Sequence, residues 1–280
     1  MEFVSNNTLI TLNDPVIVNI IKRPSLHCKT PYVADIVVND EPHMAHCPAL
    51  GCCGLSDKGS SVIVSPIKEK KENSKCTYRV ELAIVEERNR KMIVGINPKL
   101  AETIMYRMLE KNICPFLKVR DFKREKTLLN SRFDFMGTDI DGCTFVMEIK
   151  NVPLADYVDV PKKDRKNYNT ENVPYDNKIA YFPDGYRKNS TDVVSPRALK
   201  HIQELQEICI LSEHNMRAIL CFVVQRTDAI VFQPSNIDLI YKEAVQKAAL
   251  QGVEIRAIQC EWNEQGICTF KKELPVKLSE

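Results

Sequence analysis

The first third of the chain contains short runs of β-branched and other apolar residues, separated by Pro, Gly, Asn and Asp. Runs of this kind are typical of strands that end in turns. Several short strands at this spacing predict a small barrel or sandwich. The runs are PVIVNIIKRP (15–24), YVADIVVND (32–40), SSVIVSPIK (60–68) and CTYRVELAIVEE (76–87).

The hydrophobic period changes near residue 98. The segment NPKLAETIMYRMLEKN (97–112) has its apolar residues at helical spacing, at Leu100, Ile104, Met105, Met108 and Leu109. A length of 280 residues suits one or two domains. We therefore expect a strand-rich domain over residues 1–97 and a second domain over residues 98–280.

The second part alternates between helical and strand patterns. The segment 195–213 predicts a helix with Ser195 at the N-cap and Pro196 at its first position, and with an apolar face of Leu199, Ile202, Leu205 and Ile208. RAILCFVVQR (217–226) is almost continuously apolar, which predicts a central strand covered on both faces. Another helix over 235–252 and two strands over 253–262 and 267–274 complete a mixed-sheet α/β unit. Residues 156–191 are polar and predict a long irregular connection.

One hairpin carries charge where a core hairpin would carry valine. In SRFDFMGTDIDGCTFVMEIKNVPL (131–154), the pair Asp141-Gly142 predicts a turn. Because side chains alternate along a strand, Glu148 and Lys150 share a face, and the turn brings that face beside Asp134. Two carboxylates suit a hard divalent cation such as Mg²⁺ or Mn²⁺. A lysine beside them can stabilise the negative charge of a phosphoryl transition state. Alternatively, Glu148 and Lys150 form an exposed ion pair.

An Asp followed by Glu-x-Lys after a hairpin is the pattern of PD-(D/E)xK nucleases. Further segments occur in the same order as in the sugar fermentation stimulation protein (SfsA) family, which this chain resembles over roughly residues 20 to 260. They are ADIVVND, AHCPALG, VGINPKLAE, EKTLLNSRFDF, MEIKNVPL, FPD, SPRALKHIQEL and RAILCFVVQR. The resemblance implies an OB-like β-barrel followed by a PD-(D/E)xK nuclease-like domain, in a family associated with DNA binding.

The resemblance also assigns roles. It implies that Asp134 and Glu148 are metal ligands, that Lys150 is the catalytic lysine, and that Glu125 is a further ligand. Residues near the hairpin and at the start of the following helix are expected to contact nucleic acid: Lys123, Arg124, Lys126, Arg132, Arg197, Lys200 and His201. For the basic stretch 111–126, a groove that follows the backbone and a merely solvated face both remain open.

The chain departs from the family pattern in three places. Ala198 stands where the family has glycine, the connection from 153 to 194 is long, and the segment 43–53 has extra cysteines. His43, His46, Cys47, Cys52 and Cys53 raise the idea of zinc, but no C-x-x-C pair is present, and small buried thiols are the preferred interpretation. These departures affect the substrate more than the fold.

Composition narrows the class of protein. A net charge of +2 neither indicates nor excludes binding to nucleic acid. The odd number of eleven cysteines favours reduced thiols. The start lacks a signal-peptide pattern and the longest apolar run, 218–224, is too short to cross a bilayer. We expect a soluble intracellular protein, cytoplasmic or nuclear, with no membrane partner.

Together, these features predict a nucleic-acid-binding protein that hydrolyses phosphodiester bonds with Mg²⁺ or Mn²⁺, with DNA favoured over RNA. The alternative is a DNA-binding regulator, of the sugar fermentation stimulation type, whose nuclease-like centre performs no catalysis. Neither strandedness, sequence preference nor oligomeric state follows from the sequence.

Overall fold

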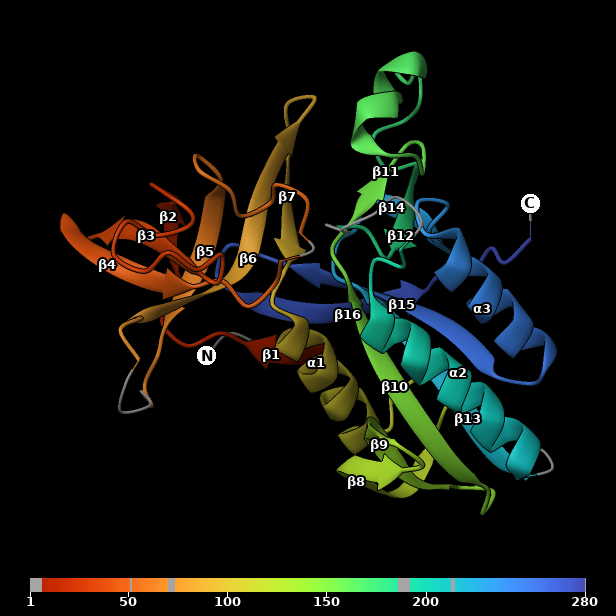
Figure 1. Cartoon of the computed structure of the whole chain (residues 1–280). Coiled ribbons are helices and arrows are strands. Elements are labelled where there is room, and N and C mark those ends of the chain that lie inside the picture. Colours follow the sequence, from red (N-terminus) through yellow and green to blue (C-terminus); the bar gives the residue numbers. More distant parts are fainter. Residues whose placement is uncertain (1–6, 51, 70–73, 186–191, 213–214, 280) are drawn as a thin grey trace.

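The computed structural model of the chain describes residues 7–50, 52–69, 74–185, 192–212 and 215–279. Within these ranges the protein has a mixed α/β fold built on three sheets. In Figure 1 a strand-rich part (orange) lies beside a larger part in which helices cover a long twisted sheet. The mixed α/β class predicted from the sequence is confirmed.

The strand-rich part is a six-stranded sheet in the order β2-β5-β6-β4-β3, with β7 paired to β6. The strands are β2 (Val16–Asn19), β3 (Val33–Val38), β4 (Glu41–His46), β5 (Ser61–Pro66), β6 (Tyr78–Glu87) and β7 (Arg90–Gly95). All four predicted apolar runs contain one of them. The sheet curls until its ends meet, because Ile21 and Lys22, just beyond β2, exchange backbone hydrogen bonds with Asp35 of β3.

The larger sheet has seven strands in the order β1-β16-β15-β13-β10-β9-β8. They are β1 (Thr8–Thr11), β8 (Val119–Leu128), β9 (Ser131–Asp139), β10 (Thr144–Val152), β13 (Met216–Val224), β15 (Glu254–Trp262) and β16 (Ile267–Glu273). β13 runs parallel to both β10 and β15 and is buried from Ala218 to Val224, as its continuous apolar sequence predicted. The pairing of β1 with β16 has no signal in the sequence pattern.

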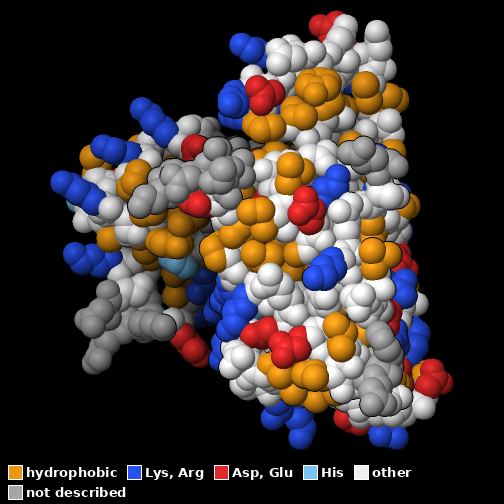
Figure 2. Space-filling model, turned by 45° about the vertical axis from the view of Figure 1, so that its right-hand side comes forward, with side chains coloured by type: hydrophobic (Ala, Val, Ile, Leu, Met, Phe, Trp, Pro, Cys, Tyr) orange, Lys and Arg blue, Asp and Glu red, His pale blue; other side chains and the backbone are white. Residues whose placement is uncertain are grey.

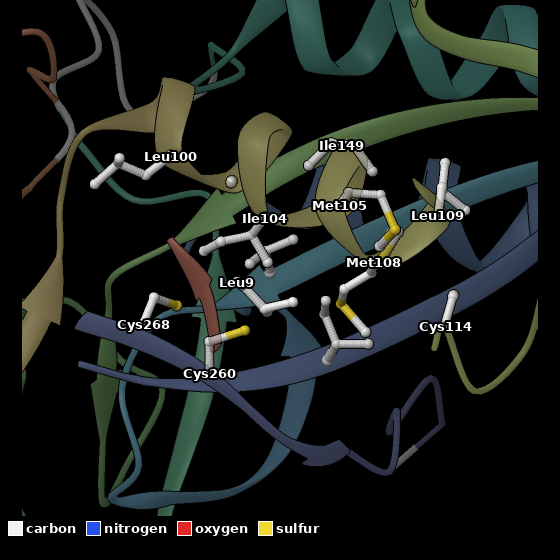
Figure 3. Close-up of a cluster of buried hydrophobic side chains, with 14 of the residues drawn as sticks. Leu9, Leu100, Ile104, Met105, Met108, Leu109, Cys114, Ile149, Cys260 and Cys268 are labelled. Atoms are coloured by element: carbon white, nitrogen blue, oxygen red, sulfur yellow. The ribbon is translucent and has the colours of Figure 1, made fainter. Parts of the chain in front are cut away.

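Three α-helices cover the two faces of this sheet. α1 (Pro98–Glu110) lies on one face, and α2 (Pro196–Leu211) and α3 (Leu239–Leu250) lie on the other. Each begins at a side-chain cap, provided by Asn97, Ser195 and Asp238 respectively. The apolar residues predicted for α1 all face the core, where they pack with Leu9, Ile149 and Cys260 from the sheet (Figure 3).

The long connection after β10 is more ordered than its polar sequence predicted. It contains β11 (Ala155–Asp156), a 3-10 helix (Lys162–Asn167) and β12 (Lys178–Phe182), and it forms a small sheet with β14 (Ala229–Pro234). Buried Lys178 anchors it, with Nζ 2.5 Å from Glu87 Oε2 and 2.8 Å from Asp228 Oδ2. Since Glu87 ends β6, this ion pair fastens the connection to the strand-rich part. Residues 186–191 lie outside the described ranges.

Among the described residues, no helix is both long and apolar enough to cross a membrane. All eleven cysteines are described, and none is in a disulfide.

Candidate active site

The charged hairpin forms as the sequence predicted. β9 and β10 pair from Thr138↔Thr144 to Phe135↔Met147, and the turn between them includes Gly142 at φ +86°. Directly beyond the last pair, Asp134 Oδ2 accepts a hydrogen bond of 2.7 Å from the backbone N–H of Ile149. A side-chain carboxylate thus holds the two strands together at the point where their ladder ends.

A cavity of about 570 Å³ opens at this point. Asp134, Glu148 and Lys150 line it together with Glu102, so the structure gathers the three residues that strand alternation placed on one face. The lining also includes Pro48 and Ala49, which follow β4 of the strand-rich part, and apolar side chains such as Leu50, Leu154 and Phe182. Figure 2 shows a hollow between the two parts of the molecule, with Lys and Arg side chains (blue) along its border.

Glu148 is the most enclosed of these groups, with only 3% of its surface exposed. Its Oε1 accepts a hydrogen bond of 2.5 Å from Lys150 Nζ and another from His201 Nδ1. Its Oε2 is buried and accepts no hydrogen bond from any residue that the structure describes. Burial alone would raise the pKa of Glu148, but Lys150 and His201 outweigh it and hold the pKa below its ordinary value. Glu148 is therefore ionised, and no described residue donates to its second oxygen.

Asp134 has the opposite electrostatic character. Burial, followed by the negative charge of Glu148, raises the pKa of Asp134 to about 7. The Ile149 N–H and Lys150 oppose this rise without cancelling it. Two carboxylates in one cavity repel each other, and a divalent cation between them would remove that cost.

Glu102, in the first half of α1, is an acidic group that the sequence reasoning missed. It is half-buried, burial raises its pKa, and the charge of Glu148 raises it further. Arg124 Nη2 lies 3.6 Å from its carboxylate. The sequence signal that could have identified Glu102 is its position directly after the N-x-x-x-A element of VGINPKLAE. The position of α1 over β10, by contrast, depends on tertiary packing.

Glu125, the further ligand implied by the resemblance, is not among the residues that line the cavity. Its carboxylate is 55% exposed and lies 3.4 Å from Arg132 Nη1. Its backbone has φ +53°, an uncommon conformation for a non-glycine residue in a strand. The geometry therefore gives Glu102 the place in the cavity that was expected for Glu125.

The predicted nucleic-acid contacts divide into two groups. Lys123, Arg124, Lys126, Arg132, Arg197 and Lys200 are exposed, and Arg197 lines the cavity. Lys200 Nζ donates to Asn130 O at 2.7 Å. These exposed side chains can reach a phosphate, so their expected contact with nucleic acid stays a prediction.

His201 differs from its expectation, because it lies on the buried face of α2 and is only 4% exposed. It stands four residues before Leu205 and seven before Ile208, which is the spacing of one helical face. Its ring packs at 6.0 Å from Phe133, between centroids, and its Nδ1 contacts Glu148. The structure therefore directs His201 to the acidic group of the site.

The residues fit a hard divalent cation such as Mg²⁺ or Mn²⁺. Such ions take oxygen ligands, and the cavity is lined by Asp134 and by Glu148, whose buried Oε2 accepts no hydrogen bond from the described part of the chain. In the described ranges, no three or more His, Cys, Asp or Glu side chains are grouped closely enough to hold a metal ion. Glu102 accordingly contributes charge in this arrangement, with Asp134 and Glu148 as the two candidate ligands.

The burial of two cysteines argues against the zinc idea for the segment 43–53. Cys47 and Cys52 are buried, and burial raises their pKa values to about 11 and about 12, which disfavours the thiolate that zinc needs. His43 Nδ1 instead contacts Thr77 Oγ1 at 3.1 Å. Cys47 and Cys52 are therefore small buried thiols, as the preferred interpretation had it, whereas Cys53 is exposed.

Comparison with known proteins identifies the family of this chain. The family model described as "Sugar fermentation stimulation protein RE domain" matches residues 99–266. The chain belongs to the sugar fermentation stimulation protein family. A homologue of SfsA from Alteromonas mediterranea is 30% identical over 257 residues, 88% of this chain and 92% of that protein. One from Clostridium novyi is 28% identical over 259 residues, 91% of this chain and 95% of that protein.

A solved member of the SfsA family has the same fold. The structure described as Pyrococcus furiosus SfsA in complex with Ca²⁺ matches with a TM-score of 0.71, covering 96% of this chain and 99% of that chain. Sequence identity is 20%, so the match concerns the fold. Because it spans both sheets, the strand-rich part and the helix-covered sheet belong to one shared SfsA architecture.

Proposed function

We propose that this protein binds nucleic acid, DNA in preference to RNA, and hydrolyses a phosphodiester bond with a divalent cation, Mg²⁺ or Mn²⁺. The observation that carries the proposal is the grouping of Asp134, Glu148 and Lys150 in one cavity, with Glu148 Oε2 left without a donor among the described residues. An exposed ion pair between Glu148 and Lys150 would have suited a structural role, but both side chains are largely buried, at 4% and 11% exposure.

In this proposal Asp134 and Glu148 would hold the cation, which supplies charge neutralisation at the phosphate and a more acidic water. Lys150 carries a positive charge within the same cavity, where low solvent access strengthens its effect on developing negative charge. Its Nζ contacts Glu148 in this structure, so it must turn toward the phosphate when substrate enters. Arg197, exposed at the border of the cavity, is placed to contact a neighbouring phosphate.

We further propose that residues 1–97 act as an OB-like binding unit and residues 98–280 as the PD-(D/E)xK nuclease-like unit. The meeting of the two edges of the curled sheet supports the first assignment, and the charged hairpin beside α1 supports the second. β1 departs from this division, since it belongs to the seven-stranded sheet. The complex of P. furiosus SfsA with Ca²⁺ supports the choice of an oxygen-seeking cation here.

The test is incubation with labelled single- and double-stranded DNA and RNA in Mg²⁺, in Mn²⁺ and in chelator. We expect cleavage with either cation and none in chelator. Asp134→Ala should abolish cleavage but leave DNA affinity intact or slightly raised, because a carboxylate facing phosphate repels it when no cation is bound. Lys150→Ala should slow cleavage about 10²–10³-fold, since its charge is needed most in the transition state.

Lys271→Ala is the matched control for the lysine variant. Lys271 is exposed, pairs with Glu261 at 2.7 Å, and is not among the cavity residues, so cleavage should continue at the wild-type rate. Wild-type protein that binds DNA in Mg²⁺ but cuts none of the substrates would contradict hydrolysis. In that case the DNA-binding regulator without turnover is the better description.

A further inference from the structure

The side chain of His201 contacts one oxygen of Glu148 through Nδ1, and Lys150 Nζ lies 3.3 Å from the same His201 nitrogen. α2 places His201 on its sheet-facing side, where the ring is almost fully buried against Phe133. Its Nδ1 meets Glu148 Oε1, and Lys150 Nζ approaches the same oxygen at 2.5 Å. An ionised carboxylate can only accept, so Nδ1 must carry the proton and donate. Glu148 thus has two donors on Oε1 and none from the described residues on Oε2.

Such an asymmetry fixes the carboxylate in one orientation. A freely rotating carboxylate offers either oxygen to a ligand, whereas two donors on Oε1 leave Oε2 available in a cavity shared with Asp134. Groups that hydrogen-bond a liganding carboxylate in this way orient it and raise its effectiveness. Lys150 alone would fix the Glu148 carboxylate poorly, because its flexible side chain must turn to the phosphate when substrate binds. The imidazole of His201 is rigid and held by packing.

We infer that His201 is a positioning residue: it holds Oε1 of Glu148 so that Oε2 faces the cation, and it leaves Lys150 able to move to the phosphate. This inference rests on the proposed function, since it concerns the same cavity. It replaces the expected direct contact between His201 and nucleic acid. It also explains why a polar ring occupies a buried position of α2 that Leu or Phe would fill without the cost of burying polar atoms.

The experiment is calorimetric titration of the full chain with Ca²⁺ or Mn²⁺ alone, without nucleic acid. His201→Leu should weaken cation binding about 10–100-fold, the usual effect of losing a hydrogen-bond partner of a ligand. His201→Asn should recover most of this loss, because its amide places a donor close to the position of Nδ1. Leu205→Ala, on the same buried face, removes packing but no contact to Glu148 and should bind the cation like the wild type.

A second readout separates orientation from general damage. In DNA binding measured in chelator, all four proteins should have similar affinities, because His201 is buried and touches no phosphate. Equal cation affinity for His201→Leu and the wild type would overturn the inference. So would failure of His201→Asn to recover, or an equal loss in Leu205→Ala. If the wild type binds neither cation, the metal-dependent function itself fails, and the inference fails with it.

Discussion

The raised pKa of Asp134 predicts that its carboxylate destabilises the fold at neutral pH. The change to test is Asp134→Asn, which removes the charge and keeps the shape and an oxygen that can accept from the Ile149 N–H. An ordinary aspartate titrates at 3.8 and Asp134 at about 7. Three pKa units at about 1.36 kcal/mol each correspond to about 4 kcal/mol.

The sign follows from proton binding. Between the unfolded value of 3.8 and the folded value of about 7, the folded state binds more protons, so stability decreases as pH rises through this window. The asparagine variant lacks this loss. Without divalent cations, it should be equal to the wild type near pH 4 and more stable by up to about 4 kcal/mol above pH 7.

The assay is urea unfolding at several pH values in chelator, followed by the same series with Ca²⁺. A cation at 100 times its dissociation constant should stabilise the wild type by about 2.7 kcal/mol and the variant far less. Asp139→Asn is a control in the same hairpin: burial opposes ionisation there, but Cys143 and Arg217 lower the pKa of Asp139. Asp139 therefore stabilises the fold above pH 4, and this variant should lose stability at neutral pH.

Two results would refute the reasoning about Asp134. One is a difference between Asp134→Asn and the wild type that does not change with pH. The other is a variant less stable than the wild type at pH 8 in chelator, which would mean that the carboxylate gains more from the Ile149 N–H than it loses by burial beside Glu148.

Three other predictions concern Glu102 in the cavity, two lysines of the basic stretch, and Lys178, which anchors the connection after β10. Glu102→Gln removes a negative charge near Asp134 and should lower both the pKa of Asp134 and the cation affinity, measured by titration with Ca²⁺ across pH; an unchanged pH midpoint contradicts it. Lys123→Ala with Lys126→Ala should reduce the salt slope of duplex binding in anisotropy measurements by about 0.9 per lost contact, and an unchanged slope makes this a solvated face. Lys178→Met should cost about 3–5 kcal/mol in urea unfolding by taking one partner from the buried carboxylate of Asp228, whereas a loss below about 1 kcal/mol would show that Arg226 suffices.

Local patterns predicted much of this protein. Strand alternation and the Asp141-Gly142 turn placed Asp134 with Glu148 and Lys150, and the predicted cap at Ser195 marks a helix start that the structure has. These features depend on residues close in sequence, so pattern and propensity suffice to find them.

The parts that the sequence did not reveal depend on packing between distant segments. Glu102 enters the site because α1 lies over β10, and no local period reports that. The apolar residues of α2 predict a buried face that includes Leu199 and leaves out His201. In the structure Leu199 is only partly buried, and the buried face also includes His201 and Glu204. A buried polar residue lies at the spacing of the buried helical face but is not apolar. A search for apolar residues at that spacing therefore misses it.

The pairing of β1 with β16 has a consequence for how the chain folds during synthesis. Thr8–Thr11 is synthesised long before its strand partner in the sheet, Ile267–Glu273. Until then β1 cannot pair, and the edge of β15 that β16 will cover stays exposed to other chains. Contacts this distant in sequence also form slowly, because a long loop must close first. Nascent chains should therefore depend on chaperones at this edge until translation passes residue 273.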